Sequence, residues 1–460
     1  MKTHQDPAKK SANADQQHLP IIMILTNIKL WRFWGLRVTL MTSDVLLLAQ
    51  NLIHYSTTTV VDGNKAGLLT LEDCLFELAR YAERSGATWS MKRFEGGHEK
   101  WPYPVSNLVV TWRKGSADQH LCYLGHVDTV PAGNAALWDN SPTLAQVKDG
   151  FLYGRGATDM KGSVAAFFSA MAEVMKQQDN VHVTAVITGD EEWAAVNGTA
   201  KVLEQMKEEG VHVDSFLVGE PSSPDLLGTH VKCGRRGSLV GKLVSHGVQG
   251  HAAYAGSFQN PNTALIKAAD LLGQYDWEGR DKGQTKTQFQ IIAMNSGDFG
   301  ASAVVPARAE MLWNIRFTSE WSPEELPNTM KALLASRPAL YDHVCVEANL
   351  HSVSLPYVTP YHGHLHDVLR EALNRVHQGP PQIDMDGGTT DGRFVQRYYP
   401  DAEVYEYGPP EHGGLMPDGA APERYTQEGG MHQVNERISL KDLEGLARDY
   451  AKIVSLYHKR

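Results

Sequence analysis

The fold of this sequence is constrained most by three apolar stretches, each of which ends in acidic or histidine side chains. They occupy residues 121–126, 181–192 and 216–220 and lie between segments of helical pattern. Short apolar runs of this kind, alternating with helices, are typical of the buried strands of a mostly parallel sheet. Open α/β sheets bind ligands at the carboxyl ends of such strands. The pattern predicts an α/β domain with a polar site at that edge.

A glycine-rich turn adds a further carboxylate to this predicted site. Gly154, Gly156 and Gly162 bracket Asp159. Such glycines permit the tight backbone turns that bring a carboxylate close to a small ligand. Apolar residues then recur at steps of four, three and four from residue 164 to residue 175, which predicts a helix directly behind the turn.

These side chains match the needs of a hydrolytic site with two metal ions. Such a site requires one carboxylate shared by both ions and further ligands for each ion. Asp159 fits the shared position, His126 and Glu220 complete one ion, and Glu192 and His432 complete the other. Each residue alone would more often be an ordinary strand-end or surface residue, so the prediction rests on the combination. His412 is a weaker alternative to His432.

The acidic pair after the second stretch supplies a general base. Neighbouring side chains on an extended chain point to opposite sides, so Glu191 is left free when Glu192 binds an ion. Asp128 lies two residues after His126. We expect it to accept a hydrogen bond from the second imidazole nitrogen and thereby to fix the tautomer of His126.

Composition excludes several classes of protein. A chain of 460 residues favours two domains. A net charge of −10 provides no basic field for nucleic acid, so no nucleic-acid partner is expected. Four cysteines without a CxxC pair predict reduced, mostly buried thiols in a cytoplasmic protein; they are Cys74, Cys122, Cys233 and Cys345.

The first forty residues are predicted to be a disordered extension, with the folded chain beginning near residue 41. Their longest uninterrupted apolar run, residues 21–25, is much too short to cross a bilayer, so no membrane partner is expected. A signal peptide is the alternative. The basic residues follow the apolar run instead of preceding it, which argues against that alternative.

Residues 237–351 are predicted to be a second domain inserted into the first, which then comprises residues 41–236 and 352–460. The inserted segment shows strand and helix patterns in the order βαββαβ, including clean alternation of apolar residues over 309–317. This order is that of a ferredoxin-like α+β sandwich. Further helices are predicted over 42–51, 201–209 and 365–376, after a Ser439 cap, and from a capping-box arrangement at Thr70 to a stop at Gly86.

Eight sequence blocks between His120 and the C-terminus also point to a known family. They are GHVDTVPAG at 125–133, DGFLYGRGATDMKGS at 149–163, DEE at 190–192, VGEPSS at 218–223, VKCGRRGS at 231–238, GVQGHAAY at 247–254, GGTTDGRF at 387–394 and MHQVNE at 431–436. In this order the blocks resemble the zinc aminoacylase/carboxypeptidase-type metallopeptidases and, within them, the succinyl-diaminopimelate desuccinylases. The resemblance implies two Zn²⁺ ions, with Co²⁺ or Mn²⁺ able to replace one. It further implies hydrolysis of a small-molecule N-acyl amino acid by a homodimer that forms through the inserted domain.

Carried over to this sequence, the family's roles fall on the same side chains. The implied metal ligands are His126, Asp159, Glu192, Glu220 and His432, with Asp159 bridging. The resemblance makes Glu191 the base and Asp128 the residue that orients His126. It also implies that His251 reaches the active site of the partner subunit and stabilises the oxyanion there.

Two arginines are candidate clamps for a substrate carboxylate. A guanidinium group matches a carboxylate with two parallel hydrogen bonds, which favours Arg235 and Arg316 for this role. An ordinary salt bridge is an equally good interpretation of each. The resemblance places contacts to the succinyl carboxylate at Arg235, Arg316, Gly388 and Thr389.

The resemblance implies that the activity is removal of succinate from N-succinyl-L,L-2,6-diaminopimelate, in lysine and cell-wall precursor synthesis. Two departures from the family weaken the substrate assignment: Ser302-Ala303 replaces an Asn-Asn pair, and the loop between Gly408 and His432 is longer. Deacylation of another N-acyl amino acid, such as N-acetylornithine, or of an N-acyl dipeptide is the alternative. A non-catalytic metal-bearing scaffold is a third interpretation, but it would have no use for Glu191 beside a full ligand set.

Overall fold

The computed structural model describes most of the chain beyond the N-terminal extension. The described ranges are residues 43–58, 66–96, 103–193, 195–282, 285–337, 343–349, 353–375, 379–415 and 429–459. The predicted extension of residues 1–40 lies outside them. Every helix within these ranges is too short or too polar to span a bilayer.

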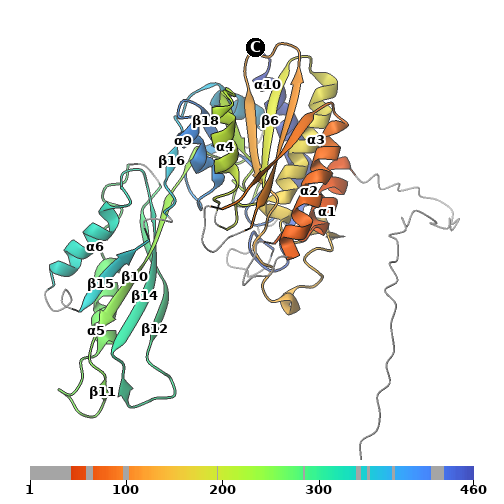
Figure 1. Ribbon diagram of the computed structural model, residues 1–460. Helices are drawn as coiled ribbons and strands as arrows, with labels where there is room; N and C mark the ends of the chain where they lie inside the picture. The colour runs from red at the N-terminus through yellow and green to blue at the C-terminus, as the bar shows by residue number, and fades with distance from the viewer. Residues whose placement is uncertain are drawn as a thin grey trace, which may run out of the picture. The chain divides into compact units, whose positions relative to one another are not determined.

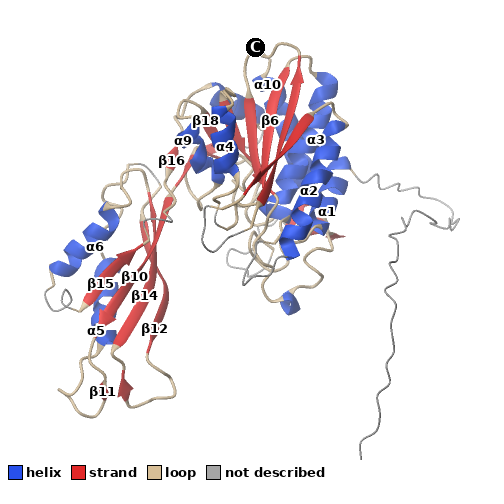
Figure 2. Cartoon of the chain, in the orientation of Figure 1, coloured by secondary structure: helices blue, strands red, loops and turns tan. Residues whose placement is uncertain are grey.

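An eight-stranded mixed sheet forms the centre of the first part of the fold (Figures 1 and 2). Across the sheet its strands are β1 (Thr88–Phe94), β2 (Val105–Lys114), β6 (Val181–Thr188), β3 (Leu121–His126), β7 (Ser215–Val218), β18 (Glu403–Glu406), β8 (His230–Lys232) and β17 (Gln382–Asp384). The strands β6, β3, β7 and β18 are parallel to one another. In contrast, β2 pairs antiparallel with both β1 and β6, and β18 pairs antiparallel with β8.

The sheet is therefore mixed. β17 also pairs parallel with β8, so four of the seven pairings in this sheet are parallel, and its parallel character is weaker than predicted. The antiparallel pairing of β1 with β2 follows from the connection between them, residues 95–104, which is shorter than the crossover that two parallel neighbours need. A strand over residues 88–94 was also missed, because its residues are half-exposed and alternate weakly.

Helices cover both faces of this sheet (Figure 1). One face packs against α1 (Asp44–His54), α2 (Ala66–Glu83), α3 (Gly162–Gln177), α8 (His364–Ala372) and α10 (Leu440–Tyr457), and the other against α4 (Thr199–Glu208) and α9 (Val395–Tyr398). In β3, Leu121 and Tyr123 join the first hydrophobic core, whereas Cys122 and Leu124 join the second. Burial on both faces explains why this strand reads as an uninterrupted apolar run.

Residues 237–348 contain a second, four-stranded sheet with its own hydrophobic core. In chain order its elements are β10 (Gly237–His246), α5 (Pro261–Gly273), β12 (Gln288–Ser296), β14 (Arg308–Phe317), α6 (Glu325–Ala335) and β15 (Val344–Ala348). The strands are antiparallel in the order β12-β14-β10-β15. The predicted alternation in β14 is confirmed, because its odd-numbered residues from Ala309 to Phe317 are all buried in this core.

Shorter elements complete the described chain. They are β4 (Gln146–Lys148), β5 (Phe151–Tyr153), β9 (Gly234–Arg235), β11 (Gly250–His251), β13 (Val304–Val305), β16 (Tyr357–Val358), β19 (Arg437–Ser439) and the helical turns η1 (Ala135–Leu137), η2 (Ala157–Lys161) and η4 (Asp391–Phe394). All four cysteines are free thiols, and all except Cys345 are buried, as predicted.

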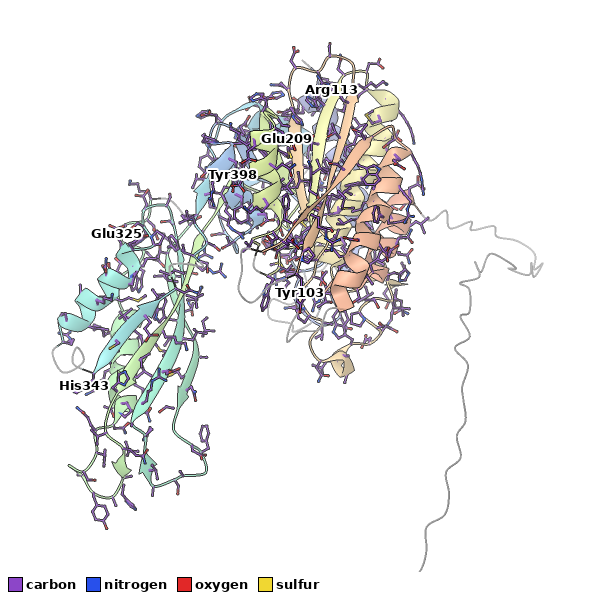
Figure 3. All side chains as sticks on the ribbon, in the orientation of Figure 1. Tyr103, Arg113, Glu209, Glu325, His343 and Tyr398 are labelled. Carbon is purple, nitrogen blue, oxygen red and sulfur yellow. The ribbon has the colours of Figure 1, made fainter. Side chains whose placement is uncertain are left out.

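Helix starts follow the sequence signals in some places and not in others. The Ser439 hydroxyl accepts a hydrogen bond from the Asp442 amide and caps α10, as predicted. The capping box predicted at Thr70 is wrong: α2 already begins at Ala66, and the Thr70 hydroxyl donates to the carbonyl of Ser56 instead. A reciprocal capping box exists at the start of α6, where Ser322 and Glu325 exchange hydrogen bonds of 3.0 and 3.3 Å. Figure 3 labels Glu325 at this end of the helix.

Candidate metal centre

The fold brings the predicted site residues together at the carboxyl ends of three adjacent strands. His126 is the last residue of β3, Glu191 and Glu192 follow β6, and Glu220 follows β7. These strands are parallel neighbours in the order β6-β3-β7, so their ends meet at one edge of the sheet. Asp159 in η2 completes this group, and a cavity of about 450 Å³ opens above it.

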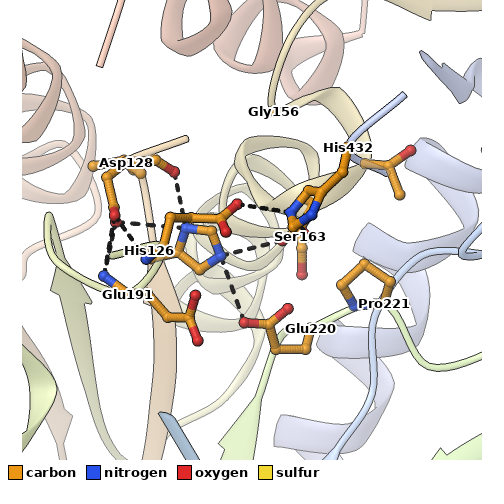
Figure 4. Close-up of polar contacts among 12 residues, drawn as sticks. His126, Asp128, Gly156, Ser163, Glu191, Glu220, Pro221 and His432 are labelled. Atoms are coloured by element: carbon orange, nitrogen blue, oxygen red, sulfur yellow. Dashed lines mark hydrogen bonds and ion pairs between the residues drawn. The ribbon is translucent and has the colours of Figure 1, made fainter. Parts of the chain in front are cut away.

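The two carboxylate oxygens of Asp159 face two different histidines (Figure 4 shows the surroundings). Oδ1 lies 3.2 Å from Nε2 of His126, and Oδ2 lies 3.2 Å from Nε2 of His432. A second carboxylate approaches each histidine: Glu220 lies 3.5 Å from His126, and Glu192 lies 3.1 Å from His432. Two sets of three candidate ligand residues therefore share Asp159.

The spacing within these sets fits a divalent cation. Ligand atoms about 2.0–2.2 Å from a tetrahedral ion lie about 3.3–3.6 Å from one another. The contacts of 3.1–3.5 Å that His126 and His432 make with their carboxylates are close to this separation. Candidate ligand atoms of His126, Asp159 and Glu192 lie within 4.8 Å of one another, and so do those of His126, Glu191 and Glu220. Imidazole and carboxylate ligands without cysteine suit zinc, cobalt or manganese.

The electrostatics of the cluster favour positive charge. Hydrogen bonds to Asp159 and Glu192 raise the pKa of His432 to about 11. Burial opposes protonation of His126, but the carboxylates of Asp159 and Glu220 outweigh it and raise its pKa well above the usual value. Burial together with the negative charge of Asp159 raises the pKa of Glu220 to about 7. A site with this potential attracts divalent cations.

Glu191 lies beside the two ligand sets, and its side chain is almost buried. Burial, followed by the charges of Glu220 and Asp391, raises its pKa well above the ordinary value of a glutamate. Its Oε1 lies 4.0 Å from the guanidinium group of Arg393. A carboxyl group with a raised pKa near the reacting atoms has the properties of a general base that later acts as an acid.

Asp128 contacts both His126 and the backbone that carries Glu191. Its carbonyl oxygen lies 3.0 Å from Nδ1 of His126, and its carboxylate lies 3.6 Å from the same nitrogen. The carboxylate also accepts hydrogen bonds from the backbone amides of Glu191 and Glu192 at 3.0 and 2.9 Å. Asp128 therefore links a metal-site histidine to the candidate base.

The predicted substrate residues all line the cavity, but their surroundings differ. Arg235 is buried and forms an ion pair with Glu406, in which Nε donates at 2.6 Å. Arg316 donates to the Thr389 hydroxyl at 3.2 Å, and Gly388 lies beside Thr389. Sequence reasoning missed other lining residues, since none belongs to a metal or acid–base pattern: Trp193, Ser238, Ser354, Thr390, Arg393 and Met431.

Two further histidines lie away from this cluster. His251 is exposed in β11, and its Nδ1 accepts a hydrogen bond from the amide of Ala253. It is not among the residues that line the cavity within the described chain. Nδ1 of His412 contacts the carbonyl of Pro224 and the carboxylate of Asp225, so this ring is engaged outside the ligand sets.

Comparison with known proteins agrees with this geometry. Residues 122–456 match the model of peptidase family M20/M25/M40. The chain belongs to this family. Its relatives include succinyl-diaminopimelate desuccinylases from Nitrosomonas eutropha, 36% identical over 75% of this chain and 85% of that protein, and from Rhodospirillum centenum, 35% identical over 90% and 97%.

Solved structures share the fold of this M20 peptidase at low sequence identity. Human carnosine dipeptidase 1 superposes with a TM-score of 0.69 at 15% identity over 90% of this chain and 96% of that protein. The metallo-carboxypeptidase Sso-CP2 from Sulfolobus solfataricus superposes with a TM-score of 0.68 at 17% identity over 90% and 99%. As a member of this peptidase family, the chain is a hydrolase of amide bonds. The side chains around Asp159 are of the kinds that hold the metal ion in a metal-dependent hydrolase.

Proposed function

We propose that this chain removes succinate from N-succinyl-L,L-2,6-diaminopimelate, a step of lysine and diaminopimelate synthesis. The observation that carries the proposal is the position of Glu191 next to two sets of candidate ligands that share Asp159. Its carboxylate also lies within ligand distance of His126 and Glu220, and its assignment as the base instead of a ligand is part of the proposal. Identity of 35–36% to desuccinylases over most of the chain supports the choice of substrate.

The proposed cofactor is a pair of Zn²⁺ ions, with Co²⁺ or Mn²⁺ able to replace one. His126, Asp159 and Glu220 would hold one ion, and Asp159, Glu192 and His432 the other; the spacing of these side chains supports this division. When bound, such ions polarise the scissile carbonyl and lower the pKa of a water molecule.

The side chains of the protein carry out the proton transfers of the hydrolysis. Glu191 accepts the proton of the attacking water and later gives it to the leaving amine. Asp128 holds the backbone amides of Glu191 and Glu192 and so keeps the base directed at the cavity. We assign His251 of the partner subunit the role of oxyanion donor, which the exposure of β11 permits.

The domain division and the assembly belong to the same proposal. Residues 41–236 and 352–460 form the catalytic domain, and residues 237–351 form an inserted ferredoxin-like domain. The antiparallel order β12-β14-β10-β15 with two helices on one face supports the ferredoxin-like assignment. A homodimer through this domain would carry His251 to the second active site. The free thiols fit the reducing cytoplasm, where we place the enzyme.

Substrate recognition is assigned to the cationic wall of the cavity. Arg316 and Thr389 are hydrogen-bonded to each other, and Gly388 adjoins them. Together with Arg235 they would bind the carboxylate of the succinyl group, since guanidinium and hydroxyl donors complement a carboxylate.

The chain itself offers one observation for a second substrate. Ser302-Ala303 cannot supply the amide contacts that an Asn-Asn pair would give to the acyl group. This favours a test against N-acetylornithine and an N-acyl dipeptide. With Zn²⁺ or Co²⁺ added, we expect kcat/KM for succinyl-diaminopimelate to exceed the other values by at least about tenfold. A preference for another acyl group would overturn the substrate assignment, and no turnover of any substrate would favour the scaffold.

A further inference from the structure

Glu436 is fully buried next to the metal centre, and its carboxylate accepts four hydrogen bonds. Oε2 accepts from Nη1 of Arg155 at 2.6 Å and from the amide of Gly156 at 3.1 Å. Oε1 accepts from the amides of Thr158 and Asp159 at 2.9 and 3.1 Å. All four partners are donors, so the arrangement suits an ionised carboxylate and no neutral side chain.

Further contacts tie the same two chain segments together. The amide of Gly154 donates to the carbonyl of Glu436 at 2.8 Å, and the Thr158 hydroxyl donates to the carbonyl of Arg437 at 2.6 Å. Nη2 of Arg155 lies 3.5 Å from the carbonyl of His432. Glu436 therefore fixes the backbone of Asp159 directly, and it reaches the backbone of His432 through Arg155.

The segment that carries His432 needs such support. His432 and Asn435 have φ angles of 62° and 55°, a left-handed conformation that non-glycine residues seldom adopt. A backbone of this kind persists where surrounding contacts hold it. Glu436 lies at the end of this segment and supplies such contacts.

We propose that Glu436 is a positioning residue that sets the separation of Asp159 and His432 and thereby the affinity for the ion that these two residues share with Glu192. The inference rests on the proposed metal pair. It assigns Glu436 no contact with substrate or with an ion. The competing explanation is that Glu436 stabilises the fold in general and has no particular effect on one ion.

The test compares Glu436→Gln with a matched control. Glutamine has one acceptor oxygen and an NH₂ group, so in either orientation two of the four donors face an NH₂ group. Glu403→Gln makes the same chemical change elsewhere on a smaller scale: Glu403 accepts the amides of Leu365 and His366 at 3.1 Å each, at the start of α8, so glutamine leaves one of these two donors facing an NH₂ group. Glu436→Asp is the second variant; it keeps a charge for Arg155, but its shorter side chain cannot reach all four donors.

The experiment titrates the full-length, metal-free protein with Co²⁺ and follows the visible absorbance of the bound ion, with thermal unfolding recorded in parallel. We expect wild type to bind two equivalents of Co²⁺. In Glu436→Gln, one of the two dissociation constants should rise by at least about tenfold, while the other changes much less. Glu403→Gln should retain both constants even if its Tm falls. Glu436→Asp decides the question if Glu436→Gln does not fold.

Each remaining outcome is decisive. If the folded Glu436 variant binds both ions within about twofold of wild type, the positioning role is wrong while the proposed metal pair stands. If both dissociation constants rise equally, Glu436 acts through the shared Asp159 or through the fold and not on the separation of Asp159 and His432, and the inference is also wrong. If wild type binds no Co²⁺, the proposed function itself fails, and the inference fails with it.

Discussion

The carboxylate oxygen Oδ2 of Asp159 lies 3.2 Å from Nε2 of His432, although the four-stranded sheet of residues 237–348 lies between these two residues in the sequence. The short distance places a candidate ligand from the turn before α3 next to a candidate ligand from the segment before β19. Neither residue could be paired with the other from local sequence spacing. Their juxtaposition makes a shared metal centre the simplest use of the site.

Replacement of Glu191 by glutamine tests the assignment of the base. Glutamine cannot accept the proton, so we expect kcat to fall by at least about a hundredfold. Metal content should stay close to that of wild type. Steady-state kinetics with metal analysis measures both. Glu209→Gln on the surface, where Glu209 contacts Lys92, is the control. Retention of more than about a tenth of the activity would show that Glu191 is not the base.

The buried pair of Arg235 and Glu406 predicts a loss of stability. Glu406 is fully buried and also accepts hydrogen bonds from Tyr357 and Thr390. Glu406→Gln leaves the guanidinium charge without its partner, so we expect the free energy of unfolding to fall by about 3 kcal/mol in urea denaturation. Glu204→Gln, in an exposed pair, should change little. Equal effects of both substitutions would contradict this account of Arg235.

Arg316 is the better candidate for direct contact with a substrate carboxylate. It lines the cavity, and no acidic side chain in the described part of the chain forms an ion pair with it. We expect Arg316→Gln to raise KM for the succinylated substrate by about tenfold or more, with a smaller change in kcat and no loss of Tm. An unchanged KM would remove Arg316 from substrate recognition.

A histidine stack far from the metal centre predicts sensitivity to acid. His182 stacks on His120 with a centroid distance of 3.7 Å. Burial, followed by the neighbouring charges of His120 and Arg113, lowers the pKa of His182 from 6.5 to about 4. Between pH 6.5 and 4, His182 therefore binds a proton in the unfolded chain but not in the folded chain. The stability that is present above pH 6.5 is lost as the pH falls toward 4.

The variant His182→Gln should flatten this dependence. Urea unfolding at a series of pH values between 7 and 4 measures the slope for wild type, for His182→Gln and for the control His246→Gln, an exposed position in β10. Parallel curves for wild type and His182→Gln would show that His182 does not cause the loss.

Much of the fold could be predicted because its signals are local. The apolar run of β3 and the alternation in β14 follow from burial on two faces and on one face, respectively. The antiparallel pairing of β1 with β2 could not be predicted, since the residues of β1 are half-exposed and give no clear strand signal. The prediction of a helix start at Thr70 is wrong because α2 begins at Ala66 and the Thr70 hydroxyl donates to the carbonyl of Ser56, a contact that local sequence does not reveal.

The candidate site likewise contains some residues that local sequence signals indicate and others whose surroundings depend on long-range contacts. The predicted strand ends and the glycine-rich turn are local signals, and they are sufficient to indicate His126, Asp159 and Glu220. The surroundings of Arg235 could not be foreseen, because its partner Glu406 lies far along the chain, at the end of the short strand β18. Long-range pairs of this kind leave no periodic signal in the sequence.

Equilibrium metal analysis tests the central claim most directly. Metal-free protein is dialysed against Zn²⁺, and the bound ion is counted for wild type, His126→Ala, His432→Ala and Asp159→Asn. Sharing of Asp159 predicts two ions per chain in wild type, one in each histidine variant and fewer than one in Asp159→Asn. A wild-type chain that binds a single ion, or an Asp159→Asn variant that still binds two, would contradict the account.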